Sequence, residues 1–97
     1  MPPLIHDHPL PYVDRLAARP ADAVTLAVIH CTELPDLATA REYGERLQHE
    51  SGTGNSGHYY IDRNGRIVQY VSLDRVAHQV SGFNPRSIGI EIGRAHV

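Results

Sequence analysis

Mostly apolar runs along the chain predict strands, and one repeating apolar stripe predicts a helix. Residues 23–30 contain no break, which is typical of a strand at the centre of a sheet with both faces covered. Residues 37–47 place apolar side chains three or four positions apart, with arginine and glutamate between them, so we expect a helix with one face on a sheet. Asp36, or Thr39 with Glu42, can cap its first turn.

Two further stretches predict the rest of the sheet. Residues 58–63 and 66–71 are rich in β-branched and aromatic residues and flank Asn64-Gly65, a pair that favours a hairpin with a type I′ turn. Residues 87–91 are expected to form another strand after a loop. The order strand, helix, hairpin, strand predicts an α/β domain with a mixed central β-sheet and flanking helices.

The domain organisation follows from the same pattern. Residues 1–22 hold five of the seven prolines and are expected to form an N-terminal extended arm. Residues 23–97 are expected to be the N-terminal portion of a single domain. Such a sheet normally has both faces covered, yet only one clear helix is predicted, and a strand that should be central comes shortly before the end. We therefore expect the architecture to be incomplete at the C-terminus.

Composition limits the kinds of binding partner and the cellular location that we expect. The chain has 97 residues, a net charge of −2 and no basic stripe, so we expect no nucleic-acid partner. No apolar stretch approaches the roughly 18 residues of a membrane span, and a single cysteine excludes an internal disulfide. The first residues lack the pattern of a signal peptide. This favours a cytoplasmic location, or the periplasm or cell envelope if an export signal is missing.

Two polar residues at the ends of apolar strands are the main candidates for chemistry. His30 and Cys31 are neighbours on a strand and point to opposite faces, so they cannot act as a base and its nucleophile. His30 is then either structural or a metal ligand at a strand end, where ligands gather in α/β folds. Glu91 also follows an apolar strand. It is either the partner of an arginine or the general base beside a metal-bound water.

Three loop residues are weaker candidates. His58 opens the predicted hairpin, His78 follows the apolar pair at residues 76–77, and Asn84 lies in a loop that contains glycine and proline. Taken alone, each histidine is typical of a hydrogen-bonded loop residue, and the asparagine is typical of a turn. The pattern by itself leaves their roles open.

Four segments, in this order and spacing, resemble one enzyme family. Residues 29–32, 56–65, 76–78 and 84–91 read IHCT, SGHYYIDRNG, VAH and NPRSIGIE. They resemble the zinc-dependent N-acetylmuramoyl-L-alanine amidases, the family that also contains phage amidases and the peptidoglycan recognition proteins. The resemblance implies the mixed sheet of that family. It also implies hydrolysis of the amide between N-acetylmuramic acid and L-alanine in peptidoglycan or muropeptides.

The resemblance also implies roles for individual residues. His30 matches the family's first zinc ligand and Glu91 its catalytic acid/base, while His58, His78 and Asn84 would line the groove that holds glycan and peptide. The family's other zinc ligands come from a later segment, so they are expected beyond the last residue of this sequence. One histidine is not a zinc site, so this chain alone is expected to bind zinc poorly and to be inactive.

The ending departs from the family. Relatives continue after the glutamate with Ile/Leu-Val-Asn, whereas residues 92–97 read IGRAHV, a hexapeptide that a common sequencing-library adapter encodes in one reading frame. We therefore interpret the chain as a truncated fragment with an artificial tail. The coding DNA tests this interpretation, because a native reading frame that continues past residue 97 would contradict it. Two other functions stay open: a peptidoglycan-binding module without catalysis, and a metal-free α/β interaction domain in which His30 and Glu91 are structural.

Overall fold

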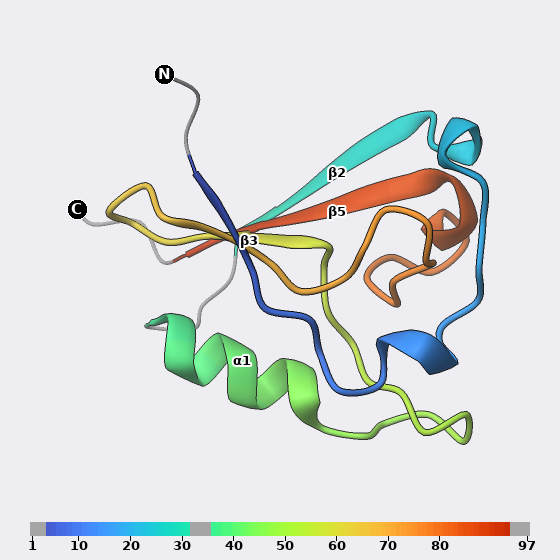
Figure 1. Cartoon of the computed structure of the whole chain (residues 1–97), viewed down its shortest axis with the longest axis horizontal. Coiled ribbons are helices and arrows are strands. Elements are labelled where there is room, and N and C mark those ends of the chain that lie inside the picture. Colours follow the sequence, from blue (N-terminus) through green and yellow to red (C-terminus); the bar gives the residue numbers. More distant parts are fainter. Residues whose placement is uncertain (1–3, 32–35, 94–97) are drawn as a thin grey trace.

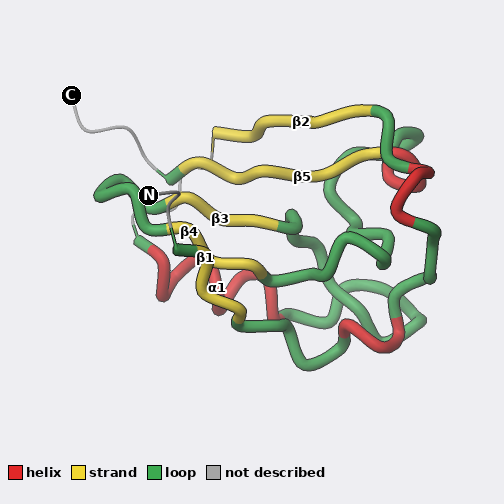
Figure 2. The backbone as a smooth tube through the Cα atoms, turned by 45° about the horizontal axis from the view of Figure 1, so that its top comes forward, coloured by secondary structure: helices red, strands yellow, loops and turns green. Residues whose placement is uncertain are grey.

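The molecule is built on a five-stranded β-sheet with the strand order β1-β4-β3-β5-β2. The computed structural model describes residues 4–31 and 36–93. Figure 2 shows the strands side by side, with β2 at one edge. The strands are β1 (Ile5–Asp7), β2 (Leu26–Cys31), β3 (Tyr59–Ile61), β4 (Ile67–Gln69) and β5 (Ser87–Ile92). The helices in this part of the chain are α1 (Leu37–Glu45) and the 3-10 helices η1 (Val13–Arg15), η2 (Ala21–Ala23) and η3 (Asn84–Arg86).

The sheet is mixed, as predicted. β2 and β3 both pair in parallel with β5, β1 pairs in parallel with β4, and β3 and β4 form the antiparallel hairpin. The hairpin turn is not type I′, because that turn needs a positive φ at both central residues and only Gly65 has one, at +87°. The N–H of Gly65 donates to the carbonyl oxygen of Asp62 at 2.8 Å. A tight turn followed by a left-handed glycine therefore closes the hairpin.

β2 does not occupy its predicted central place. Among the described strands it pairs only with β5, so it lies at an edge of the sheet. Its side chains alternate between half-buried and exposed, and Ile29 keeps 62% of its surface exposed. The apolar run at residues 23–30 thus correctly predicted a strand. It did not predict the number of neighbours, because pairing depends on segments far away in the sequence.

The described part of the N-terminal arm packs onto the sheet. β1 pairs with β4, and the arm then brings Leu10, Tyr12 and Leu16 into the core, each 3% exposed or less. Arg19 is 8% exposed, and its guanidinium donates to backbone carbonyl oxygens, including that of Ser87 at 2.8 Å. Proline lacks a backbone donor but tolerates extended structure at a sheet edge, so a proline-rich arm can still supply a short strand.

Helix α1 covers the face of the sheet that holds the core (Figure 1). Asp36 caps it as predicted, because its carboxylate accepts the backbone N–H of Thr39 at 2.8 Å. Ala40 is buried in the same cluster as Tyr60 and Val68 of the sheet, so the predicted apolar stripe does face the strands. None of the helices in the described ranges is long and apolar enough to cross a membrane. The core cluster comprises Leu10, Tyr12, Leu16, Ala40, Tyr60, Val68, Tyr70, Val71 and Ala77.

Candidate active site

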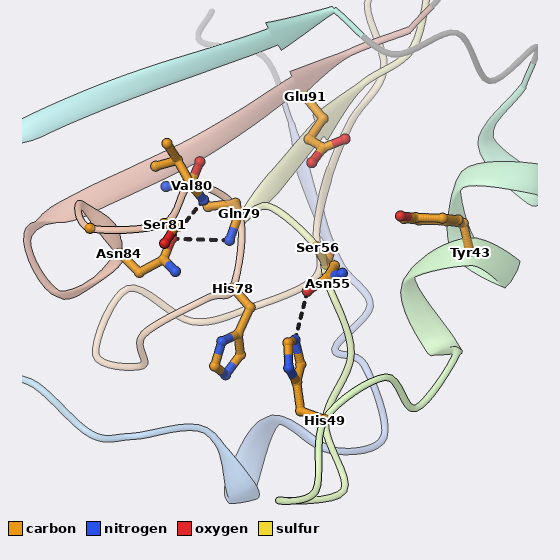
Figure 3. Close-up of a pocket in the computed structure, with 11 residues that line it drawn as sticks. Tyr43, His49, Asn55, Ser56, His78, Gln79, Val80, Ser81, Asn84 and Glu91 are labelled. Carbon is orange, nitrogen blue, oxygen red and sulfur yellow. Dashed lines mark hydrogen bonds between the residues drawn. The ribbon is translucent and has the colours of Figure 1, made fainter.

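The ends of β2 and β5 bring His30 and Glu91 together. The two strands are parallel, and His30 lies directly opposite Glu91 in their register. Residues opposite each other in paired strands point to the same face of the sheet, and this is the face that carries α1. Figure 3 shows the Glu91 carboxylate directed into the space between the sheet and Tyr43 of α1. One imidazole and one carboxylate therefore lie opposite each other on this face, and of the two only Glu91 lines the cavity described below.

Glu91 is shielded from water but not isolated. Burial raises the pKa of its carboxyl above the ordinary value, while the nearby His30 and the backbone N–H of Gly57 act in the opposite direction. A Cβ at position 57 would lie 2.9 Å from Cγ of Glu91 and 2.9 Å from the carbonyl oxygen of Gly89, so only glycine fits there. A half-buried carboxyl with a raised pKa is suited to accept a proton from water and return it.

The His30 ring is held by a side chain from the loop before η3. Its Nε2 atom lies 2.6 Å from Oε1 of Gln79. The amide nitrogen of the same Gln79 donates to the hydroxyl oxygen of Ser87, also at 2.6 Å. Gln79 therefore bridges β2 and β5 beside Glu91, and it limits how the imidazole can rotate.

A cavity of about 470 Å³ opens in front of Glu91. Of the three residues expected in the groove, His78 and Asn84 line this cavity and His58 does not. The lining residues come from α1, from the loop before β3, from the loop and η3 before β5, and from β5 itself (Figure 3). The cavity is lined by Tyr43, His49, Asn55, Ser56, His78, Gln79, Val80, Ser81, Gly82, Asn84 and Glu91.

His78 is stacked on a second histidine within the cavity. The rings of His49 and His78 have centroids 4.4 Å apart and an interplanar angle of 30°, and Figure 3 shows them side by side. Nε2 of His49 lies 2.7 Å from the side-chain oxygen of Asn55. Burial lowers the pKa of His78, and the neighbouring His49 lowers it further. His78 therefore tends to be uncharged at neutral pH, and the two stacked rings offer an aromatic surface to a ligand.

Asn84 shapes the loop that forms one wall of the cavity. Its side-chain oxygen accepts the backbone N–H groups of Gln79 at 3.0 Å and Val80 at 2.7 Å (Figure 3). This is the turn-making role expected of an asparagine in a loop that contains glycine and proline. Because Asn84 also lines the cavity, it can meet a ligand as well as hold the loop.

His58 occupies the core instead of the groove. Its side chain is fully buried. Nδ1 accepts the backbone N–H of Gly89 at 3.1 Å, and Nε2 donates to the carbonyl oxygen of Arg75 at 2.9 Å. The guanidinium of Arg19 lies 3.1 Å from the same Nε2. Burial lowers the pKa of His58, and the Arg19 cation adds to this effect. As a neutral group, the ring is thus hydrogen-bonded to two backbone segments, at Gly89 and at Arg75.

The sequence did not single out several residues of this site. His49 lies among polar residues and Gln79 has no motif around it, so neither stands out in the sequence. The helical spacing of residues 37–47 makes Tyr43 part of the apolar stripe, yet Tyr43 is 40% exposed and lines the cavity. The sequence does place one histidine in the loop before the hairpin and one in the loop after it. No local pattern indicates that the two loops meet, so the stacked pair could not be predicted.

The described residues do not by themselves form a metal site. Residues 4–31 and 36–93 contain no group of three or more His, Cys, Asp or Glu side chains placed to hold a metal ion. Zinc sites use three or four protein ligands, and His30 offers one imidazole with the Glu91 carboxyl opposite. These residues fit a first ligand and a neighbouring base, but they do not complete the site.

Comparison with known families matches most of the chain. The model of the Amidase_2 family, described as N-acetylmuramoyl-L-alanine amidase, matches residues 20–95. This range contains all five site residues proposed from the sequence. No curated protein matches the chain at the sequence level.

Solved structures share the fold. The endolysin amidase LysCS from Clostridium intestinale URNW superposes with a TM-score of 0.75 at 21% identity, over 95% of this chain and 59% of that one. The amidase LysC from the same organism superposes with a TM-score of 0.71 at 20% identity, over 95% of this chain and 60% of that one. A mutant endolysin from Bacillus subtilis superposes with a TM-score of 0.62 at 23% identity, over 94% of this chain and 61% of that one. The mixed sheet with its flanking helix is therefore the fold of these solved structures, and the chain spans about 60% of their length.

Proposed function

Because the chain belongs to the N-acetylmuramoyl-L-alanine amidase family, we propose that it supplies the base-bearing part of a peptidoglycan amidase. The bond cleaved would be the amide between N-acetylmuramic acid and L-alanine. The proposal rests chiefly on the pairing of His30 with Glu91 on one face of the sheet, beside a cavity of about 470 Å³. The overall fold alone would not support it, because one fold hosts many functions.

Glu91 has the properties of a general base. Its carboxylate points into the cavity (Figure 3) and its pKa is raised by burial. We propose that it takes a proton from the attacking water and delivers it to the leaving amine of L-alanine. The N–H of Gly57 holds the carboxylate in place for both transfers. A positioned base of this kind contributes roughly 10²- to 10⁴-fold to the rate.

We propose zinc as the cofactor, with His30 as one of its ligands. The remaining ligands would lie outside the described residues. When bound, the metal would lower the pKa of water and polarise the amide carbonyl. The contribution of this chain is to place the imidazole on the same face as the base.

The cavity wall suits a substrate made of sugar and peptide. Its polar side chains include Asn55, Ser56 and Asn84, which can hydrogen-bond hydroxyl and amide groups. The stacked rings of His49 and His78 offer a flat surface against which a sugar ring can pack. We propose His78 and Asn84 as substrate contacts, and we assign His58 a supporting role only.

The first test uses a protein that extends this chain to the length of its structural relatives. The wild type should release stem peptides from muropeptides or from intact peptidoglycan, and supplying both substrates distinguishes them. Glu91→Gln should lower the rate by roughly 10²- to 10⁴-fold and keep the zinc content. His30→Ala should lose both.

Two results would contradict the proposal. An active Glu91→Gln variant would remove the carboxylate from the mechanism, and an unchanged zinc content in His30→Ala would remove the imidazole from the metal site. Muropeptide binding without any hydrolysis by the extended wild type would identify a binding module instead.

A further inference from the structure

Gln79 contacts both strands that carry the proposed site. Its Oε1 atom lies 2.6 Å from Nε2 of His30, and its amide nitrogen lies 2.6 Å from the hydroxyl oxygen of Ser87. Ser87 begins β5 and is fully buried. The glutamine therefore joins the edge strand β2 to its only described neighbour at the position of the imidazole.

The Gln79 side chain has little freedom to move. Its backbone N–H donates to the side chain of Asn84 at 3.0 Å, which fixes where the side chain starts. Its Cγ packs so closely on Gly89 that a Cβ at that position would lie 2.8 Å from it. The amide end is held by Ser87. A side chain fixed along its whole length can impose an orientation on a softer neighbour.

The polarity of these contacts determines the protonation of the ring. A side-chain amide presents an oxygen that only accepts and a nitrogen that only donates. With the nitrogen directed at Ser87, the oxygen faces His30 and accepts a proton from Nε2. A neutral imidazole carries one proton, so Nδ1 then keeps its lone pair. Among the described residues no hydrogen bond to Nδ1 is found.

We propose that Gln79 is a positioning residue that holds His30 in the Nε2–H tautomer and leaves Nδ1 available as the ligand atom. Only the ligand role depends on the proposed function. The tautomer is a property of the metal-free chain. Histidine ligands usually donate their second N–H to a fixed acceptor, and loss of that acceptor typically costs about 10- to 100-fold in metal affinity. In this chain a glutamine fills that role.

The test is long-range ¹H–¹⁵N NMR of the ¹⁵N-labelled 97-residue chain at about pH 8, where an ordinary histidine is neutral. In the wild type we expect His30 to show a protonated Nε2 and an unprotonated Nδ1. Gln79→Met keeps the length of the side chain and removes the acceptor, so the ¹⁵N shifts of the two ring nitrogens should move toward each other. Gln48→Met, in a loop that does not touch His30, should leave both shifts unchanged.

A second variant covers the case in which Gln79→Met does not fold. Ser87→Ala keeps Gln79 but frees its amide, so the two shifts should converge in the same direction by a smaller amount. A wild-type ring protonated on Nδ1, or shifts that both folded variants leave unchanged, would overturn the proposal. In the extended protein, Gln79→Met should weaken zinc binding by about 10- to 100-fold. Unchanged affinity alongside a changed tautomer would overturn the ligand role of Nδ1 but not the tautomer.

Discussion

The imidazole of His58 is held neutral by the groups around it. Its Nδ1 accepts from Gly89 and its Nε2 donates to the carbonyl oxygen of Arg75. A second ring proton would lose the first of these bonds and place a cation beside Arg19. Burial is the largest cause of the lowered pKa of His58 and the Arg19 cation adds to it, while the hydrogen bond to the carbonyl oxygen of Arg75 acts in the opposite direction. Folding therefore opposes protonation of this residue.

The pH dependence of stability should show this effect. Below about pH 6.5, the ordinary histidine pKa, the unfolded chain binds a proton that folded His58 resists. The contribution of neutral His58 to the free energy of unfolding should therefore be complete above about pH 6.5. It should decrease as the pH falls from there to the lowered folded-state pKa. Urea unfolding between about pH 8 and 5.5 would measure it.

The matched variants are His58→Gln and His6→Gln. His58→Gln should lose roughly 1–3 kcal/mol at neutral pH, because buried groups lose their partners, and its stability should depend less on pH. His6 is exposed on β1, so its variant should behave like the wild type. Equal pH slopes for His58→Gln and the wild type would rule out His58 as the origin of the effect.

At the scale of elements, the first turn of α1 depends on Asp36. The N–H of Thr39 donates to its carboxylate and holds the pKa of Asp36 below the ordinary value. This contribution to stability is present at neutral pH and is lost as pH falls through the lowered folded-state pKa. Asp36→Ala should lower the melting temperature measured by circular dichroism. Asp36→Asn can still cap the helix, so its melting temperature should stay close to that of the wild type. Equal losses in both variants would exclude the cap.

The elements themselves were largely readable from the sequence, and their neighbours were not. The hairpin, the capped helix and the strands at residues 26–31 and 87–92 follow from local patterns. The edge position of β2 and the strand contributed by residues 5–7 depend on pairing with distant segments. Local periodicity carries no such information.

The site divides in the same way. His30 and Glu91 could be selected because a polar residue that ends an apolar strand is visible locally, and the register of β2 and β5 brings them together. The burial of His58 and the bridging position of Gln79 arise from contacts between loops and strands. The glutamine has no local pattern that distinguishes it from any other surface glutamine.

At the scale of the whole molecule, the two faces of the sheet differ. α1 and the cavity lie on the face of His30 and Glu91. On the opposite face, the strand registers align a row of side chains across all five strands: Ile5, Ile67, Ile61, Ile92 and Cys31. Ile5 and Ile92 are 48% and 36% exposed, and Ile29 beside them is 62% exposed. Exposed apolar rows of this kind promote association between molecules.

We expect this face to limit the solubility of the 97-residue chain. Ile29→Thr keeps a β-branched residue and removes apolar surface from an edge strand, so it should raise the concentration at which light scattering first increases. Its stability should change by less than about 0.5 kcal/mol, since the position is largely exposed. Ile88→Thr, on a strand with neighbours on both sides, is the comparison that should lose stability. An unchanged scattering threshold for Ile29→Thr would show that this face does not drive association.

The place of β5 between β3 and β2 also fixes when His30 and Glu91 can come together during synthesis. β2 leaves the ribosome early, but its partner among the described strands, β5, follows several seconds later at roughly 5–20 residues per second. Throughout that interval the nascent polypeptide carries an unpaired apolar strand, which is the kind of segment that chaperones bind. Insertion of β5 joins β2 to β3 and brings Glu91 opposite His30 in one event, so a nascent chain that lacks residues 87–92 does not have this pair.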